Sequence, residues 1–235
     1  MKSFSMMLKP LALSVALLSI LAVSSSEARA DEVTIAGYTN GCFNGNVGGG
    51  CVAGVPPNTS ATQTASLFGL SFVNSTIQSG TTVNGFRAIG GNPIAPPTQN
   101  SNNLGAFNLA NTQAVYNGNT FTLRVTFTAP TGISGGGSEL FSATLVGSVL
   151  SNGNGGVQID FDNSPRLFTF SSGSTSGSFT FSVNDLALDP GQTGAVTGQI
   201  TAAQQNAIPE PTTMLLLGTG LAGVAARIRK RRKSA

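Results

Sequence analysis

Short runs of alternating apolar and polar residues recur along the middle of the chain. In residues 120–128 the odd-numbered positions are Phe, Leu, Val and Phe, and the even-numbered positions are Thr or Arg. Successive side chains of a β-strand point to opposite faces of its sheet, so this period of two predicts a half-buried strand. Residues 157–162 and 179–183 alternate in the same way and predict two further strands.

A hairpin is predicted near the end of this alternating region. Phe168 and Phe170 flank Thr169, and Ser171 to Ser178 contains only Gly, Ser and Thr before the run 179–183 begins. Two such runs joined by turn-forming residues are typical of a β-hairpin. Weaker strand candidates are 33–38, 67–73, 104–109, 140–149 and 195–201. No segment of residues 31–208 shows a 3.6-residue apolar period bounded by helix caps, so we expect no long helix there.

The number and spacing of these runs predict the fold class. Eight or nine short strands separated by Gly, Asn and Pro turns indicate an all-β fold, and an antiparallel β-sandwich suits them best. We expect the sandwich ectodomain to span residues 64–204. Residues 31–63 form a loop-rich N-terminal segment that contains both cysteines, while residues 1–30 and 205–235 have compositions of their own.

The first 30 residues have the three parts of a secretory signal peptide. Lys2 and Lys9 precede an apolar run at 11–23, and Ala28-Arg29-Ala30 supplies the small-residue cleavage pattern. We therefore expect a signal helix that signal peptidase removes after Ala30. A retained membrane anchor would need a longer apolar stretch than these 13 residues.

The C-terminal segment 205–235 also has three parts. Pro209-Glu210-Pro211 is followed by the uncharged run 212–226 and then by six basic residues, Arg227, Arg229, Lys230, Arg231, Arg232 and Lys233. A helix of 15 residues would be about 22 Å long, which makes it a short transmembrane helix beside a hydrocarbon core of about 30 Å. By the positive-inside rule the basic end stays cytoplasmic. The two prolines favour an extended peptide that a processing enzyme can bind.

These parts, in this order, resemble the PEP-CTERM sorting domain of bacterial surface proteins. The resemblance covers residues 208–235, with Pro209, Glu210 and Pro211 as the sorting signal and the basic cluster as the membrane stop. It implies recognition by an exosortase, a membrane-embedded cysteine transpeptidase-like enzyme of bacteria that make extracellular polysaccharide. The alternative is a plain stop-transfer anchor, which would explain the span and the charges but not Pro-Glu-Pro. By its pattern alone, the stretch 104–201 also resembles the β-rich choice-of-anchor ectodomains of bacterial surface proteins.

Composition narrows the chemistry that the chain can perform. It has no histidine and two cysteines, so Ser-His-Asp and Cys-His catalytic sites and histidine-bound metals are excluded within it. Cys42 and Cys51 enclose eight residues, four of them glycine, and we expect them to form a disulfide after export; two free thiols are the alternative. A zinc site would need two further ligands that the chain does not supply.

The net charge of the chain is concentrated in its ends. The formal charge is +3, but residues 31–208 contain three arginines and seven acidic residues, a net charge of −4. The net positive charge therefore resides in the leader and the tail, and nucleic acid is not an expected partner.

The acidic residues of the ectodomain suggest two weaker functional hypotheses, calcium binding and hydrolysis by carboxylates. Asp160, Asp162 and Asn163 could ligate Ca²⁺ if a loop brought further oxygens, although the same spacing describes an ordinary solvated strand face. Asp185 and Asp189 are expected to cap a turn. Glu139 could belong to a carboxylate pair of a hydrolase, but no nucleophile, base and orienting group can be named together, so we expect no catalytic residue and no enzyme.

The sequence therefore predicts a secreted, exosortase-processed protein of the cell surface or the extracellular polysaccharide matrix, without cofactors or a metal. Signal peptidase and exosortase are the expected processing enzymes. The membrane is the expected partner before processing, with an inner-membrane intermediate, and matrix polysaccharide is a candidate partner afterwards. The alternative function is a carbohydrate-binding or adhesive surface module, and a hydrolase that uses carboxylates alone is a more distant third.

Overall fold

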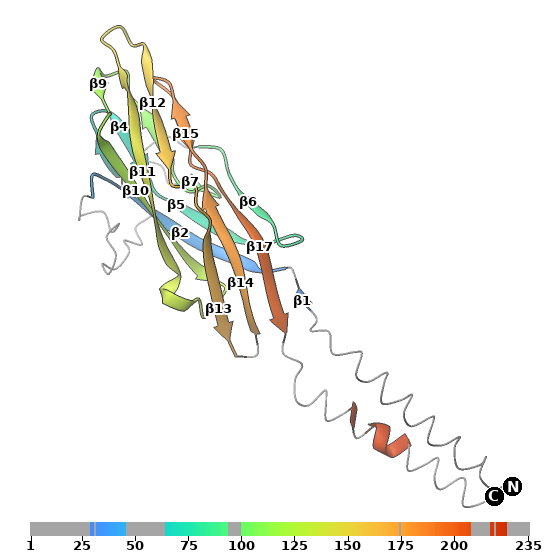
Figure 1. The fold of residues 1–235 in the computed structure, drawn as a ribbon. Helices are drawn as coiled ribbons and strands as arrows, with labels where there is room; N and C mark the ends of the chain where they lie inside the picture. Colours follow the sequence, from blue (N-terminus) through green and yellow to red (C-terminus); the bar gives the residue numbers. More distant parts are fainter. Residues whose placement is uncertain are drawn as a thin grey trace, which may run out of the picture. The chain divides into compact units, whose positions relative to one another are not determined.

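The computed structural model describes residues 29–30, 32–45, 64–93, 100–173, 175–207, 217–218 and 220–224. β-Strands make up most of this part. It also contains one short 3-10 segment, η2 (Ser134–Gly137). The strands are β1 (Arg29–Ala30), β2 (Thr34–Phe43), β3 (Thr64–Leu67), β4 (Leu70–Val73), β5 (Ser75–Thr81), β6 (Arg87–Ile89), β7 (Asn100–Ser101), β8 (Ala106–Leu109), β9 (Ala114–Val115), β10 (Asn119–Ala129), β11 (Ser138–Val149), β12 (Gly155–Phe161), β13 (Arg166–Ser172), β14 (Thr175–Val183), β15 (Leu186–Leu188), β16 (Thr193–Ala195) and β17 (Gly198–Ala207) (Figure 1). The prediction of an all-β fold is confirmed.

The described strands form three sheets. The largest has eight strands in the order β15-β12-β11-β10-β2-β5-β7, with β9 added to β11. The second has five strands in the order β1-β17-β14-β13, with β6 added to β17, and the third has four in the order β16-β8-β4-β3. The recorded registers are antiparallel with one exception, since β7 runs parallel to β5. That exception departs from the wholly antiparallel arrangement expected from the sequence.

The two smaller sheets pack against the same face of the eight-stranded sheet. Phe121 of β10 contacts Phe72 of β4 and Phe107 of β8, with ring centroids 4.8 and 4.7 Å apart. Six residues further along β10, Phe127 contacts Phe168, Phe179 and Phe181 of the β13–β14 hairpin at 4.9, 5.0 and 5.3 Å. Positions 121 and 127 differ by an even number and so lie on one face of their strand. One hydrophobic core therefore joins all three sheets.

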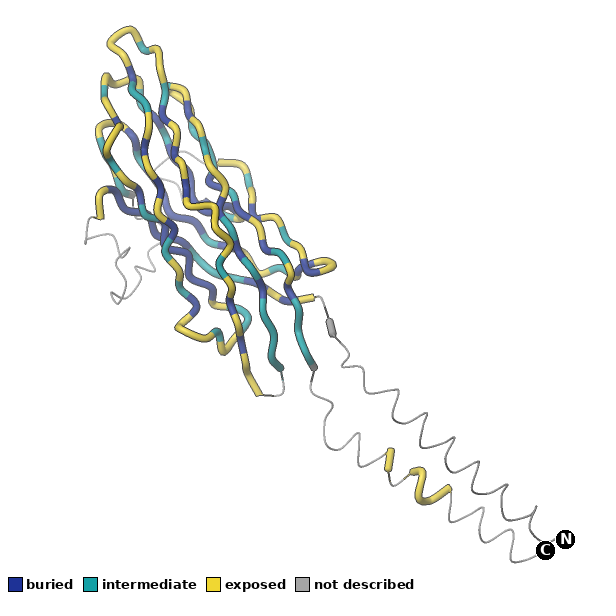
Figure 2. The backbone as a smooth tube through the Cα atoms, in the orientation of Figure 1, coloured by how far each residue is buried: buried dark blue, intermediate teal, exposed yellow. Residues whose placement is uncertain are grey.

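Burial along β10 follows the predicted alternation and adds to it. Phe121, Leu123, Val125 and Phe127 are buried, as the period of two predicts. Two residues of the opposite face, Arg124 and Thr126, are buried as well, at 9% and 6% exposure. β10 lies between β11 and β2 in the eight-stranded sheet, so both of its edges are paired, and residues in its middle are buried on both faces (Figure 2). The expected solvent face is present only towards the two ends of the strand.

Two predicted strands of the N-terminal half have other bounds in the structure. The strand predicted at 33–38 is present as the longer, ten-residue strand β2, which pairs with β10 on one side and β5 on the other. Residues 67–73, expected as one strand, instead turn at Phe68 and Gly69 and belong to the hairpin β3–β4. Both glycine and phenylalanine adopt positive φ there, and this reverses the chain. The boundaries of the predicted domains stay predictions.

The predicted hairpin after residue 166 is present. β13 and β14 pair in antiparallel register from Arg166↔Phe181 to Ser172↔Thr175. The strands extend further than expected, because the Gly, Ser and Thr residues predicted as a loop continue the ladder on both sides. Hydroxyl side chains serve as the solvent-facing positions of these strands.

Candidate functional site

The sorting signal Pro209, Glu210 and Pro211 and the basic cluster 227–233 lie outside the described residues. Between them, residues 217–218 and 220–224 are helical and exposed. No helix in the described part of the chain is long and apolar enough to cross a membrane. The predicted signal peptide also lies outside the described residues, apart from Arg29 and Ala30.

The strand that leads to the sorting segment is part of the folded unit Ala30–Gln205 for most of its length. β17 lies between β14 and β1 in the five-stranded sheet and also pairs with β6, from Gly198↔Ile89 to Ile200↔Arg87. Ile200 and Ala203 of this strand are buried in the core at 0% and 2% exposure. The last strand of the fold is thus held by its packing up to the residues that precede the tail.

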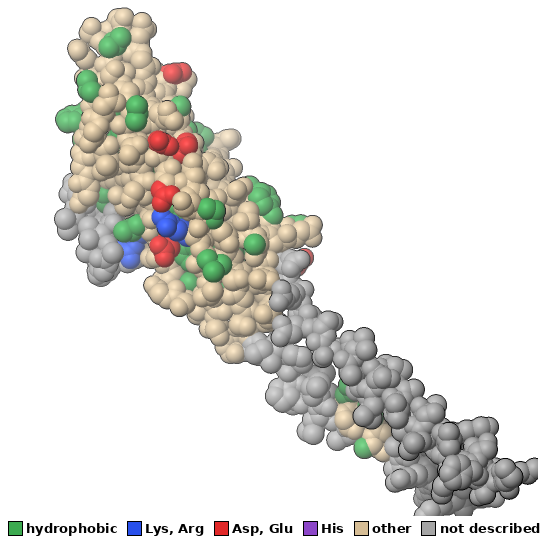
Figure 3. Space-filling model, in the orientation of Figure 1, with side chains coloured by type: hydrophobic (Ala, Val, Ile, Leu, Met, Phe, Trp, Pro, Cys, Tyr) green, Lys and Arg blue, Asp and Glu red, His purple; other side chains and the backbone are tan. Residues whose placement is uncertain are grey.

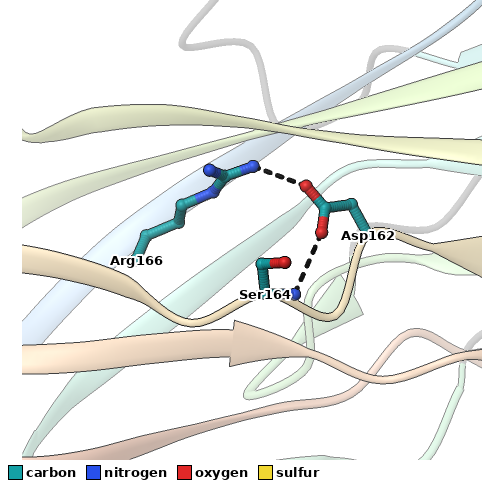
Figure 4. A network of polar contacts seen from close by, with 3 residues as sticks. All are labelled: Asp162, Ser164 and Arg166. Atoms are coloured by element: carbon teal, nitrogen blue, oxygen red, sulfur yellow. Dashed lines mark hydrogen bonds and ion pairs between the residues drawn. The ribbon is translucent and has the colours of Figure 1, made fainter.

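The best-defined polar network of the described surface lies at the end of β12. Asp162 accepts a hydrogen bond of 3.1 Å from the Ser164 amide and forms an ion pair of 2.7 Å with Arg166 (Figure 4). Hydrogen bonds from the Ser164 side chain and amide, followed by the charge of Arg166, lower the pKa of Asp162. The Arg166 guanidinium carbon also lies 5.9 Å from the centre of the Phe141 ring, within the range of a cation–π contact. These contacts fix the connection between β12 and β13.

Asp185 ties the same end of β12 to the chain after β14. Its carboxylate accepts hydrogen bonds from the Phe161 amide at 2.8 Å and from the Asn163 side chain at 3.1 Å. The predicted turn near Asp189 is present, because Asp189 and Gln192 exchange backbone and side-chain hydrogen bonds. Asp185 therefore bridges two strands rather than capping that turn.

These contacts involve two of the three candidate calcium ligands, Asp160, Asp162 and Asn163. Asp160 is exposed on β12 and Asp162 is exposed directly after the end of that strand, with Phe161 buried between them. The Asp162 carboxylate accepts a hydrogen bond from Arg166, and the Asn163 side chain donates to Asp185, so protein partners already engage both candidate ligands. Among the described residues no three acidic or cysteine side chains could hold a metal ion together. Glu139 is exposed on β11, opposite Val125 of β10.

Cys42 lies near the end of β2 and is buried at 1% exposure. It is disulfide-bonded. Cys51 lies outside the described residues, so its pairing with Cys42 stays a prediction. The bond would hold the end of a central strand of the largest sheet.

Charge is sparse on the described surface. On the face drawn in Figure 3 the acidic side chains lie in a band, with basic side chains only in its lower part, and uncharged polar side chains and backbone cover most of the rest. This agrees with the net charge of −4 for residues 31–208. The surface has no broad basic patch on this face that would attract nucleic acid.

Comparison with known protein families identifies a motif in the C-terminal segment. A family profile for the PEP-CTERM protein-sorting motif matches residues 207–232. The chain carries a PEP-CTERM protein-sorting motif. The motif marks it as an exported protein that is targeted by an exosortase to the cell surface, as the sequence predicts. No curated protein and no solved structure matches the chain.

The PEP-CTERM motif begins where the folded part ends. Its first matched residue, Ala207, is also the last residue of β17. The sequence predicts that this segment begins at residue 205. The structure shows that residues 202–207, three alanines and three amide residues, continue β17, which the periodicity of large apolar side chains could not reveal.

Proposed function

We propose that this PEP-CTERM protein is a non-enzymatic surface or matrix protein whose folded part is a β-sandwich delivered by exosortase. The proposed order begins with export, cleavage after Ala30 and retention by the span 212–226. Exosortase then recognises Pro209, Glu210 and Pro211, removes the tail and transfers the protein to the envelope or the polysaccharide matrix. The observation that carries the proposal is the position of Ala207, at which β17 ends and the matched motif begins. An enzyme can therefore remove the motif without removing a strand.

Packing supports the sandwich architecture within this proposal. The five-stranded and four-stranded sheets contribute the phenylalanines that meet Phe127 and Phe121 on one face of β10. Two sheets lying side by side against a third form two layers around a common core, which is the arrangement of a sandwich. A folded cargo of this kind needs no catalytic residues to reach its destination.

The test of processing compares the full chain in bacteria with and without a working exosortase. An epitope at the C-terminus should be lost from the wild-type protein only when exosortase is present. The triple variant Pro209→Ala, Glu210→Ala and Pro211→Ala should keep the epitope in both strains. If the mature surface protein keeps its tail in the strain with exosortase, sorting fails as an explanation and a plain anchor replaces it.

A second candidate function is carbohydrate binding. A pocket of about 300 Å³ lies between β5 and β6 and is lined in part by Gln78, Asn102 and Arg87. Asn102 donates a hydrogen bond of 3.0 Å to Gln78, so both amides are already oriented, and amide groups suit sugar hydroxyls. Glycan-array binding by the processed protein, lost in the double variant Gln78→Ala and Asn102→Ala, would support this function. Absence of binding to any glycan would remove it.

A further inference from the structure

Two exposed apolar side chains lie together on a tight turn beside the last strand. Val83 is 68% exposed and Phe86 is 49% exposed. The amide of each donates to the carbonyl of the other, at 2.9 and 3.0 Å, with Asn84 and Gly85 between them at positive φ. Directly paired residues of a hairpin place their side chains on the same face. Val83 and Phe86 therefore form one apolar surface, here named the 83–86 turn.

The chain on both sides of the 83–86 turn is fixed by hydrogen bonds. Before it, Thr82 donates its amide to Val33 at 3.0 Å and accepts the Val33 amide on its hydroxyl at 2.8 Å. After it, the Arg87 guanidinium donates to the carbonyls of Ile35, Gly80 and Gln78 at 2.8, 2.7 and 2.7 Å. A surface held in this way loses little conformational entropy when a partner binds it.

The 83–86 turn rests directly on β17. Ala203 donates its amide to the Gly85 carbonyl at 3.0 Å. A Cβ at position 85 would lie 2.9 Å from the Ala203 carbonyl oxygen, so the close approach requires glycine. Ala203 stands four residues before Ala207, the first residue of the sorting motif. The apolar surface is thus attached to the strand that leads into the processed segment.

Chain length limits the distance between this surface and the sorting signal. Pro209 stands six positions after Ala203, and a fully extended chain of that length spans at most about 20 Å. A small globular domain is about 30 Å across. An enzyme that holds Pro209–Glu210–Pro211 therefore extends to within reach of the 83–86 turn.

The geometry points to the 83–86 turn as a docking surface for the exosortase that binds the sorting signal. Val83 and Phe86 would add an apolar contact outside the recognised tripeptide, so that the enzyme also binds the end of the folded cargo. This inference rests on the proposed function, because it requires that exosortase processes the chain. The uncharged surface and its fixed backbone suit a contact made by burying apolar area.

The test measures how fast the tail is removed from the full chain in bacteria that contain exosortase. The double variant Val83→Ser and Phe86→Ser should slow tail removal about tenfold in a pulse-chase experiment, since truncating the central residues of an interface typically has this effect. The matched control is Phe68→Ser and Val115→Ser. These residues are 61% and 62% exposed, and they lie near β4 and β9, away from β6 and β17 (Figure 1). The control should be processed at the wild-type rate.

Three outcomes would overturn the docking surface while leaving the proposed function intact. The first is processing of the 83–86 variant at the wild-type rate, and the second is equal slowing of the control. The third concerns lipid: Phe86→Trp introduces the only tryptophan of the chain, and quenching of its fluorescence by spin-labelled lipids in membranes without exosortase would assign the turn to the bilayer instead. If wild-type and the Pro-Glu-Pro triple variant both keep their tails, the proposed function itself fails.

Cross-linking gives a measurement that does not depend on a polar substitution. A photoreactive phenylalanine analogue placed at position 86 should cross-link to exosortase, whereas the same analogue at position 68 should not. Cross-linking at both positions, or at neither, would contradict docking through the 83–86 turn.

Discussion

Asp162 is an exposed carboxylate with two defined contacts, to the Ser164 amide and to Arg166. The Ser164 hydrogen bonds and the Arg166 charge lower its pKa from the ordinary value of 3.8. A carboxylate with a lowered pKa stabilises the folded state above its unfolded pKa, and this contribution is lost as the pH falls through the folded pKa. The difference in unfolding free energy between wild-type and Asp162→Asn should therefore be constant above about pH 5 and shrink below about pH 4.

Chemical denaturation across this pH range measures the effect. Asp160→Asn is the matched control, because it removes a carboxylate from the same face of β12 without touching Ser164 or Arg166. An equal response of the two variants would attribute the pH dependence to lost negative charge in general rather than to the network around Asp162.

Gly41 occupies a position on β2 where a side chain has no room. A Cβ there would lie 2.4 Å from ring atoms of Phe72 and 2.5 Å from Phe121. Gly41→Ala should therefore lower the free energy of unfolding by about 1–3 kcal/mol through overpacking. Adding Phe72→Leu should recover part of the loss by making space. If the two substitutions are simply additive in thermal and chemical denaturation, the cost does not arise from this contact.

Single residues also show where sequence reasoning succeeds and where it stops. The exposed face shared by Asp160 and Asp162 follows from period two alone. The partner of Asp162 does not, because Arg166 is brought to it by the bend after β12 rather than by the spacing of a regular strand. Likewise, the bridging role of Asp185 requires knowing that β15 pairs with β12.

At the scale of elements, β10 is the strand on which the sheets meet. Phe127 is 4% exposed and packs edge-to-face against three phenylalanines of β13 and β14. Phe127→Ala should lower the free energy of unfolding by about 3–5 kcal/mol, since it removes a large buried ring and leaves a cavity. Phe68→Ala, at a residue 61% exposed, should change it by no more than about 0.5 kcal/mol. Comparable losses in denaturant titrations would contradict the inter-sheet role of Phe127.

The predicted strands are those that bury large apolar side chains at every second position, such as β10, β12 and β14. Several strands that escaped prediction are either very short, such as β9 and β15, or polar. β5 has the sequence Ser-Thr-Ile-Gln-Ser-Gly-Thr with one large apolar side chain, and the second half of β2 buries Thr39 and Asn40. Their place depends on pairing with distant strands: β2 joins β10, about 80 residues away in sequence. The local periodicity of a sequence does not predict which distant strands pair.

At the scale of the whole molecule, processing should reverse the sign of the net charge. The full chain has a sequence pI of about 9.2, whereas residues 31–208 carry a net charge of −4. The precursor should therefore focus in the basic range and the mature protein in the acidic range on an isoelectric gel. A mature form that still focuses above neutral pH would show that the basic tail has been kept.

The position of β17 has a mechanical consequence for a protein held at its C-terminal end. The antiparallel hydrogen bonds of β17 to β6 run perpendicular to the strand, and β14 and β1 flank it in the sheet. Tension applied along β17 from its end therefore loads these bonds in shear, so that many must break together. The same force applied across the strand would open them one after another. A cell-surface protein tethered through this strand would resist flow and traction better than its modest size suggests.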